Sequence, residues 1–533
     1  MPDYLNRLLI DGASLSWVQA RLNAGLTAEQ IYKDEWSGSN GHPARLIGCE
    51  LRPPDFSDSG NADVFCRTYR EQLIYTDSRG WLAYDGKRWE ANDHQAYKLA
   101  GKLSADMLED AKREYFAAVQ QQAEVEVAVS EGAQDDDAKD KAKKITKRAK
   151  SYLDHAQQLR NERRIKAMLE LAKHELAIDP SILDADPDIL NTPGGIIHLP
   201  TGKLMPHDPK RFCTKITAVS PGTKGAEMWI NHLKLVTQND GSLMGFHQEV
   251  AGMCLFGKVY QEGAIFADGG GANGKSSTYN AEAIVLGDYA GSIDVKTLTT
   301  DKQNRGPTLA TLRGLRMVLC GELEEGKRLS PSTLKQICST DKINAEEKFK
   351  APESFKPSHT LIMYTNHMPK VGSTDKGTWR RIIVVPFKAD LEASGVPVVK
   401  NYEDVLAKEA GPAILAWMLE GARNFAADGF HLSIPDAVDE ATEAYKDNEN
   451  WLGNFLSECC VQDPNARIRT GDLYKAYQEW AVSLNEYVRR GNDFTAAMQT
   501  EGFVYTTSKG YKTWHGIRLS SDVSYKNYRS AIG

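Results

Sequence analysis

The sequence has no long apolar run, no C-x-x-C pair and no excess of positive charge. Its apolar runs, such as Met317 to Cys320, are far too short to cross a bilayer. Its eight scattered cysteines indicate a reducing compartment and argue against a zinc ribbon. The N-terminus carries no export signal, so we expect a cytoplasmic protein. Because the formal net charge is −7, any nucleic-acid contact has to come from a local basic surface.

The length of 533 residues is enough for about three or four domains, and pattern changes suggest where they divide. We expect a multidomain α/β protein. A helical lead and linker would occupy residues 1–60 and an α+β and helical region residues 61–215. An α/β core would follow over residues 216–430, with a small domain over residues 431–533.

The strongest motif lies between residues 269 and 276, where G-x-x-x-x-G-K-S follows an apolar run that predicts a strand. Glycines let backbone N–H groups close around phosphates, and Lys275 would reach the outer phosphates of ATP. The Ser276 hydroxyl would bind Mg²⁺. The alternative is a chance glycine-rich turn. The residues expected to contact the nucleotide are Gly269, Gly270, Gly271, Ala272, Asn273, Gly274, Lys275, Ser276 and Ser277.

Three further features follow in the order that an ATPase requires. A buried-strand pattern over residues 315–320 precedes Glu322 and Glu324, and Glu322 could hold Mg²⁺ and polarise the attacking water. A second apolar strand over residues 360–364 precedes Asn366, which could orient that water. Arg380 and Arg381 then stand before a third strand, where an arginine could stabilise transition-state charge from a neighbouring subunit.

These blocks resemble the superfamily 3 helicases of the phage/plasmid primase and poxvirus primase-helicase family. The resemblance rests on GGGANGKSS, LRGLRMVLCGELEEGKRLSPSTLKQI and FKPSHTLIMYTNHMPKVGSTDKGTWRRIIVVPF, with DADPDILNTPGGIIHLPTGKL upstream. It implies an AAA+-like P-loop core, a homohexameric ring and 3′ to 5′ translocation on DNA. It also assigns Lys275 and Ser276 to the phosphate loop, Glu322 and Glu324 to the acidic motif, Asn366 to the sensor and Arg380-Arg381 to the arginine pair.

Two regions are predicted to contact DNA. The family pattern places a channel hairpin between residues 343 and 356, and its tip here would be Lys348, Phe349 and Lys350; a charged turn without function is the alternative. Three helices and a hairpin after Trp451 predict a winged helix. This domain could bind DNA phosphates or serve as a protein docking module. Its candidate phosphate contacts are Arg489, Arg490, Lys509 and Lys512.

The region before residue 215 leaves alternatives open. Trp81 and Trp89 could stack on bases or pack across the strands of a small sheet. A helix with Ile145, Ala149, Tyr152, Ala156 and Leu159 has a heptad seam. Residues 139–166 hold eleven Lys or Arg and three Asp or Glu, which could form a phosphate-contacting face or a solvated one.

The same region shows no signature of primer synthesis. The calcium-loop register fails around Asp184, Asp186 and Asp188, so we interpret this stretch as a capped turn before a hairpin, with metal binding as the alternative. No Cys/His cluster or catalytic aspartate pair precedes it, so we expect a helicase without primase activity.

The leading hypothesis is an ATP-driven, Mg²⁺-dependent replicative DNA helicase of a phage, plasmid or satellite element. Its partners would be DNA, copies of itself and possible replication proteins such as a primase or polymerase. A replication initiator that assembles on origin DNA with little unwinding is the main rival. An AAA+ remodeller of proteins is disfavoured by the basic hairpin tip and the winged helix.

Overall fold

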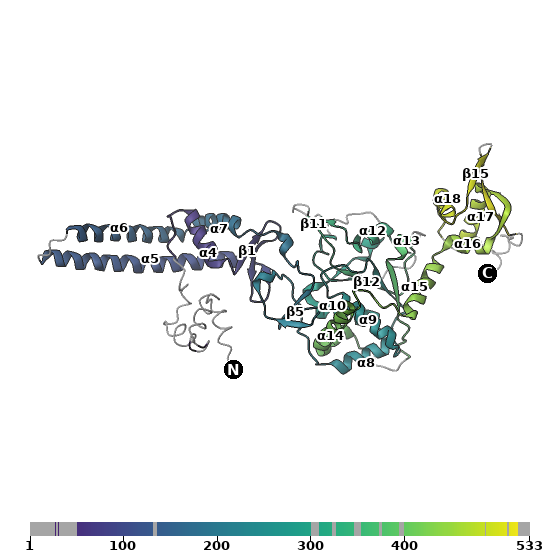
Figure 1. Cartoon of the computed structure of the whole chain (residues 1–533), viewed down its shortest axis with the longest axis horizontal. Coiled ribbons are helices and arrows are strands. Elements are labelled where there is room, and N and C mark those ends of the chain that lie inside the picture. Colours follow the sequence, from purple (N-terminus) through teal and green to yellow (C-terminus); the bar gives the residue numbers. More distant parts are fainter. Residues whose placement is uncertain are drawn as a thin grey trace. The chain divides into compact units, whose positions relative to one another are not determined.

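The computed structural model describes Thr27, Gln30 and residues 51–131, 136–299, 309–321, 327–345, 353–371, 376–393, 399–484, 487–508 and 511–520. These residues belong to two compact units that divide near residue 220. Figure 1 shows both units, and its labels are used below. No helix in the described ranges combines the length and the apolar character needed to cross a membrane.

The first unit begins with a helix packed beside a small antiparallel sheet, as the sequence predicts. The elements are α4 (Asp58–Tyr69), β1 (Leu73–Thr76), β2 (Gly80–Tyr84) and β3 (Trp89–Ala91). Trp81 and Trp89 are 3% and 2% exposed. Trp89 lies opposite Tyr84 across the β2–β3 pair, with ring centroids 5.3 Å apart. Cross-strand packing is therefore confirmed, and the stacking platform is wrong because neither ring is accessible.

A long helical hairpin, which we call the arm, extends this unit (Figure 1). It comprises α5 (Asp93–Ser130) and α6 (Asp136–Leu159), and α7 (Glu162–Leu176) packs against both. Ala149, Tyr152, Ala156 and Leu159 are fully buried, which confirms most of the heptad seam. Ile145 is 38% exposed and was wrongly placed in it. Thr146 takes the position next to α5 instead, where its Oγ1 donates to Ala118 O at 3.1 Å.

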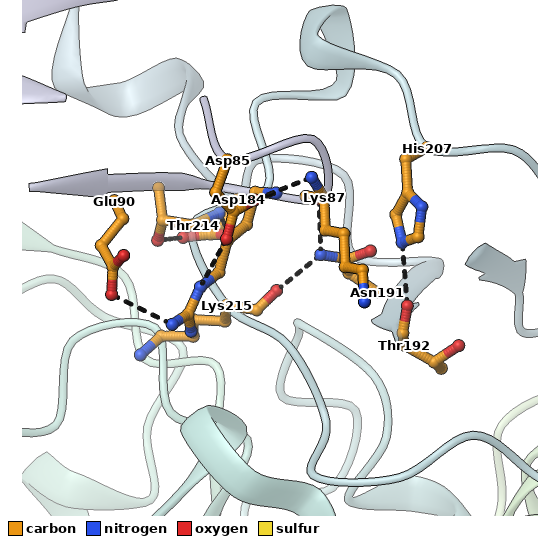
Figure 2. Close-up of polar contacts among 10 residues, drawn as sticks. Asp85, Lys87, Glu90, Asp184, Asn191, Thr192, His207, Thr214 and Lys215 are labelled. Carbon is orange, nitrogen blue, oxygen red and sulfur yellow. Dashed lines mark hydrogen bonds and ion pairs between the residues drawn. The ribbon is translucent and has the colours of Figure 1, made fainter. Parts of the chain in front are cut away.

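A second three-stranded antiparallel sheet completes the first unit, with β4 (Ile189–Thr192), β5 (Gly195–His198) and β6 (Lys203–Met205). Figure 2 shows how polar side chains connect it to the β2–β3 turn. The buried amide Nδ2 of Asn191 donates to the backbone oxygens of Lys87 and Lys215, both at 3.0 Å. One buried side chain thus satisfies two backbone groups from separate segments, which fixes these segments to each other.

The three aspartates of the predicted turn have separate partners. Asp184 accepts from the Thr214 backbone N–H at 2.7 Å, and Asp186 lies 3.4 Å from Arg211. Asp186 also accepts from the backbone N–H of Asp188 at 3.1 Å. These are contacts of a capped turn, and within the described ranges no three His, Cys, Asp or Glu side chains gather in a possible metal site.

The second unit is built on a five-stranded, all-parallel sheet with the order β13-β7-β12-β9-β8. Its strands are β7 (Ala264–Asp268), β8 (Ala290–Ile293), β9 (Met317–Cys320), β12 (Thr360–Thr365) and β13 (Ile382–Pro386). The residues of β7, β9, β12 and β13 are nearly all buried, as expected for a sheet covered on both faces. This explains why continuous apolar runs predicted these four strands, whereas the half-exposed β8 had no such signal.

Helices cover this sheet (Figure 1). The long helix α14 packs against α8, α9 and α10, while α15 packs against β13. An antiparallel strand pair, β10 and β11, also belongs to this unit. The bounds are α8 (Ala226–Val236), α9 (Gly241–Met253), α10 (Lys275–Leu286), α12 (Pro331–Ile337), β10 (Ile343–Ala345), β11 (Glu353–Phe355), α13 (Lys376–Trp379), α14 (Tyr402–Ala427) and α15 (Asp436–Asn448).

The C-terminal part has the three predicted helices and the predicted hairpin, together with a strand that the sequence analysis missed. Its elements are α16 (Trp451–Cys459), β14 (Cys460–Arg469), α17 (Thr470–Ser483), α18 (Gly491–Thr500), β15 (Tyr505–Ser508) and β16 (Tyr511–Leu519). The missed strand β14 pairs with β16 and contains Pro464. The register shifts between Gln462 and Arg467, so a bulge accommodates the proline that argues against a strand.

Glu282 is a buried carboxylic acid on α10. It is 1% exposed, and burial raises its pKa from 4.5 to about 8. Its Oε2 atom has no hydrogen-bond partner within the described residues. The carboxyl group is therefore neutral in the folded chain at neutral pH, whereas it ionises near pH 4.5 once unfolding exposes it. The unfolded state consequently becomes more favourable as pH rises from 4.5 to about 8.

We predict that Glu282→Gln removes this pH dependence. The difference between the free energy of unfolding of the variant and that of the wild type should increase by about 1.4 kcal/mol per pH unit between roughly pH 6.5 and 7.5. Urea denaturation at pH 6.5, 7.5 and 8.5 measures it. Glu227→Gln, at an exposed position of α8, is the control and should show no such trend. A gain that stays constant with pH would contradict the raised pKa.

Candidate functional site

The candidate site is built on the segment that joins β7 to α10, residues 269–274, which we call the glycine loop. Gly274 has φ of 84° and Ala272 has φ of 54°, both in the left-handed region. A Cβ atom on Gly269 would lie 2.2 Å from Asn273 Nδ2 and 2.4 Å from the Phe387 backbone oxygen. Close packing therefore requires glycine at position 269, in addition to the close approach of phosphates for which the sequence analysis expected it.

Asn273 holds the glycine loop in this conformation. Its side chain is 2% exposed, and Nδ2 donates to the backbone oxygens of Gly270 at 2.9 Å and Phe387 at 3.2 Å. The sequence analysis assigned Asn273 only to nucleotide contact. The structure shows that its amide braces the loop against the chain that leaves β13, so the loop shape is set before any ligand binds.

Lys275 and Asn366 meet at the carboxyl edge of the sheet. Lys275 is 4% exposed, and its Nζ donates to Gly269 O at 3.0 Å, Asn273 Oδ1 at 3.2 Å and Asn366 Oδ1 at 2.5 Å. Asn366 directly follows β12, which pairs in parallel with β7. Parallel pairing thus brings together two residues that lie 91 positions apart and that the sequence analysis singled out separately.

Ser276 and Ser277 follow in the first turn of α10, where unpaired N–H groups and the helix dipole favour an anion. Ser276 is exposed, so its hydroxyl is accessible from the loop. Asp268 precedes the loop, and burial raises its pKa while the charge of Lys275 partly offsets that rise. This edge of the sheet therefore combines a buried cation and the N–H groups of a first helical turn with Asp268, a carboxyl group that is easier to neutralise than an exposed one.

A cleft of about 840 Å³ opens beside the glycine loop. One wall is the loop together with the chain after β13, and the other is α15. The volume is in the range typical of small-molecule sites. The sequence analysis did not identify this wall. The sequence feature that could have indicated a packed helix here is an apolar stripe at helical spacing, formed by Val438, Ala441 and Tyr445. Val438 and Tyr445 are buried.

The two candidate arginines have different environments. Arg381 is 7% exposed, and it donates to Glu262 Oε2 at 2.6 Å and to Gly377 O at 2.8 Å. The side chain of Arg380 is 66% exposed and lies 3.6 Å from the same carboxylate. Only Arg380 presents its guanidinium to the surroundings.

Both arginines lie at the edge of the sheet opposite to the glycine loop. They precede β13, whose residues Ile382 and Pro386 pair in parallel with Ala264 and Asp268 of β7. Five residues of strand, roughly 16 Å, therefore separate the arginine end of β13 from the loop end of β7. Neither arginine is beside the Lys275 of its own chain.

Several predicted residues lie outside the described ranges. They are Glu322, Glu324, Lys348, Phe349, Lys350 and Lys509. Their neighbours are described. Strand β9 ends at Cys320 beside β12, so residue 321 leaves the sheet at the same edge as Asn366, and β10 pairs with β11 on either side of the predicted hairpin tip.

The C-terminal candidates divide into one buried and two exposed side chains. Arg489 is 7% exposed, and its guanidinium carbon lies 4.4 Å from the ring centroid of Trp451. Burial lowers its pKa. Arg489 is therefore a packing residue, and its assignment to DNA contact is corrected because the Trp451 ring covers it. Arg490 and Lys512 are exposed.

The glycine loop provides a test of its own geometry. We predict that Gly269→Ala lowers the free energy of unfolding by about 1–3 kcal/mol, because its Cβ would overlap Asn273 and the Phe387 backbone. Gly271→Ala is the matched control, since no atom lies within 4 Å of its Cβ position. Its effect should be within about 0.5 kcal/mol. Thermal and urea denaturation measure both variants, and equal losses would contradict the packing argument.

Comparison with known proteins finds two family models that match this chain. Residues 62–238 match a model described as D5 N terminal like. Residues 267–381 match one described as a family of unknown function, DUF5906. The second match contains the glycine loop, Asn366 and both arginines.

The curated relatives are viral proteins. A "Putative helicase" of Acanthamoeba polyphaga mimivirus is 26% identical over 273 residues, 48% of this chain and 28% of that protein. A "Putative helicase" of Frog virus 3 is 28% identical over 244 residues, 42% of this chain and 25% of that protein. A "Putative primase" of African swine fever virus is 26% identical over 240 residues, with coverage of 42% and 25%.

The matched region thus spans about a quarter of the length of these relatives. The solved apo structure of the NrS-1 C-terminal region aligns with 56% of this chain and 78% of its own, at a TM-score of 0.36 and 13% identity. Residues 62–238 and 267–381 thus carry a D5 N terminal like and a DUF5906 domain, and the relatives similar to this chain are named putative helicases and primases, which is consistent with the superfamily 3 resemblance.

Proposed function

We propose that this chain is an ATP-dependent DNA helicase whose second unit is an AAA+-like P-loop ATPase. The observation that carries the proposal is the contact between Lys275 Nζ and Asn366 Oδ1 at 2.5 Å, beside a braced glycine loop at the start of α10. A buried amine, the N–H groups of a first helical turn and a neighbouring amide form a set that suits a nucleoside triphosphate.

The chain's own residues divide the work on ATP. Lys275 would release Asn366 and bind the outer phosphates, while the N–H groups of the glycine loop and the first turn of α10 bind the remaining oxygens. Asn366 would then be free to orient the attacking water. The cleft between the glycine loop and α15 has room for the base and ribose.

Mg²⁺ fits the same edge of the sheet. The exposed Ser276 hydroxyl is an oxygen donor of the type that Mg²⁺ prefers, and Glu322 follows the neighbouring strand β9. Bound there, the ion would neutralise charge that develops on the phosphates. Glu322, with Glu324, would also polarise the attacking water.

The arginine geometry supports action between subunits. A guanidinium about one strand length from the phosphates of its own chain cannot contact them, but the exposed Arg380 can reach the site of a neighbour in a ring. Arg381 would hold this segment in place through Glu262. We therefore assign the finger to Arg380. We also propose a closed hexameric ring, because each site needs an arginine from an adjacent copy.

DNA would be moved through the ring by the tips between β10 and β11, formed by Lys348, Phe349 and Lys350, with 3′ to 5′ translocation as the superfamily resemblance implies. The C-terminal part has the helix and strand order of a winged helix, with Arg490, Lys509 and Lys512 as its candidate phosphate contacts.

Primer synthesis is a second candidate function. The observation in its favour is that some relatives are named primases. This chain matches only about a quarter of their length, so the name refers to proteins with much additional sequence. A primer-synthesis assay with the full chain distinguishes the two functions.

We predict that Lys275→Ala lowers ATP hydrolysis by about a hundredfold or more, because it removes the charge that the phosphates would meet. It should also abolish unwinding of a forked DNA with a 3′ tail in ATP and Mg²⁺. Lys408→Ala, at an exposed position of α14, is the matched control and should retain both activities. Wild-type hydrolysis without unwinding would instead favour a replication initiator that assembles on origin DNA.

The two arginines should respond differently to substitution. Arg380→Ala should leave the free energy of unfolding unchanged and lower hydrolysis by roughly a thousandfold. Arg381→Ala should lower the free energy of unfolding by about 2 kcal/mol, because it removes a charged hydrogen bond to Glu262. Mixing Arg380→Ala with Lys275→Ala subunits should restore part of the activity. Absence of recovery in mixed assemblies, with both variants folded, would argue against a finger from the adjacent subunit.

A further inference from the structure

The arm carries a strongly basic surface that the ATPase site does not use. Residues 141–150 of α6 hold six Lys or Arg and no Asp or Glu. The lysines at 141, 143, 144 and 147, and Arg148, are all exposed. We call these five side chains the arm cations. The buried positions of α6 in this stretch, Ala142 and Ala149, face the hairpin core, so the arm cations cover the outward side of the helix.

The neighbouring helix does not neutralise this charge. Thr146 Oγ1 donates to Ala118 O at 3.1 Å, and Lys150 Nζ lies 5.8 Å from the Tyr115 ring centroid. These contacts place residues 115–123 of α5 beside the arm cations, and that stretch contains no charged residue. Carboxylates flank this stretch, with Asp137 and Asp140 on α6 and Glu114 and Glu124 on α5, so the excess of positive charge is concentrated at residues 143–148.

Ion pairing changes along α6. Lys150 pairs with Asp154 at 2.7 Å, and on α7 Lys166 pairs with Glu162 at 2.6 Å. Among the residues that the structure describes, none of the arm cations takes part in an ion pair. Lys143 with Lys147, and Lys144 with Arg148, are like-charge pairs at i,i+4, each of which costs a helix about 0.2–0.5 kcal/mol. A solvated helix face more often alternates charges of opposite sign, so a block of like charges is an arrangement that an external polyanion would stabilise.

We propose that the arm cations bind the phosphate backbone of duplex DNA. The proposal rests on the DNA-directed function proposed above. It adds a DNA contact in the first unit, outside the residues that form the ATPase core. From residue 141 to residue 150 the helix rises roughly 13 Å, a length over which a duplex presents about eight phosphate charges. Residues 141–150 of α6 contain no aromatic side chain, and the adjacent stretch of α5 offers only Tyr115 and the exposed Phe116. Single-strand binding uses a row of rings on which successive bases stack, so this surface favours duplex DNA.

Salt dependence tests the proposal directly. The full chain without nucleotide would be titrated with fluorescent 30-base-pair duplex and with a 30-nucleotide single strand across a range of KCl concentrations. The variant Lys143→Gln, Lys144→Gln, Lys147→Gln should lower the slope of log affinity against log salt for the duplex by about 2–3, because each phosphate contact contributes about 0.9. The slope for the single strand should change less.

A matched control removes three lysines that already have carboxylate partners. Lys112, Lys166 and Lys173 pair with Glu109, Glu162 and Glu170, so their replacement by Gln should change the duplex slope by less than about one. An unchanged slope in the arm variant, an equal loss in the control, or a loss confined to the single strand would each overturn the proposal. DNA binding is measured without ATP, so this test does not depend on ATP hydrolysis. If the proposed ATPase function is wrong, the wild type will fail to hydrolyse ATP in a separate assay.

Discussion

The structure of the second unit depends on the burial of one amine. Lys275 is almost completely inaccessible, and its charge is held by oxygens from Gly269, Asn273 and Asn366. A buried ammonium group is costly unless each of its protons finds an acceptor. Satisfying it requires the glycine loop to turn back on itself, Asn273 to be braced by Phe387, and β12 to lie beside β7 with its end level with the loop. The apolar packing of the sheet and the polar site are therefore not independent features. A shift in strand register would leave the charge without its acceptors.

The parallel sheet also separates functions along its strands. Carboxyl ends gather at one edge, where the glycine loop and Asn366 lie, and the Arg380-Arg381 pair lies at the other, before β13 begins. In a single chain these groups cannot meet. This separation gives a physical reason for assembly in the proposed mechanism, because a neighbouring copy can bring the exposed Arg380 to a place that its own fold does not reach. The buried Arg381 contributes differently, through its ion pair with Glu262, so two adjacent arginines of the same sequence motif have unlike roles.

Much of the sheet could be predicted from the sequence, because parallel strands buried on both faces appear as continuous apolar runs such as residues 264–267 and 382–387. The glycine loop between β7 and α10, and the position of Asn366 at the end of a buried strand, could also be predicted from residue type and order. What could not be predicted depends on contacts between distant segments. The brace by Asn273, the burial of Arg489 under Trp451 and the α15 wall of the cleft each need a partner far away in the chain. Strand β14 was missed because Pro464 argues against a strand unless a bulge receives it, and its partner β16 lies about fifty residues later.

Helix α10 shows that the site is associated with a loss of stability in the second unit. It follows directly on the glycine loop that lines the cleft, so its position within the unit sets the position of the loop. His232 of α8 provides one anchor: Nε2 lies 2.8 Å from Thr278 Oγ1, which itself donates to Gly274 O at 2.9 Å. Burial lowers the pKa of His232 to about 4, so the ring is neutral at neutral pH and joins α8 to the end of the glycine loop without adding charge. One turn further along, Glu282 is buried with its Oε2 unpaired within the described residues. The same helix thus carries the Thr278 contact, which fixes the site, and the buried Glu282, which destabilises the unit. Rotating α10 to expose Glu282 would also move Lys275. The position of Lys275 therefore gives a reason why the buried carboxyl group is tolerated.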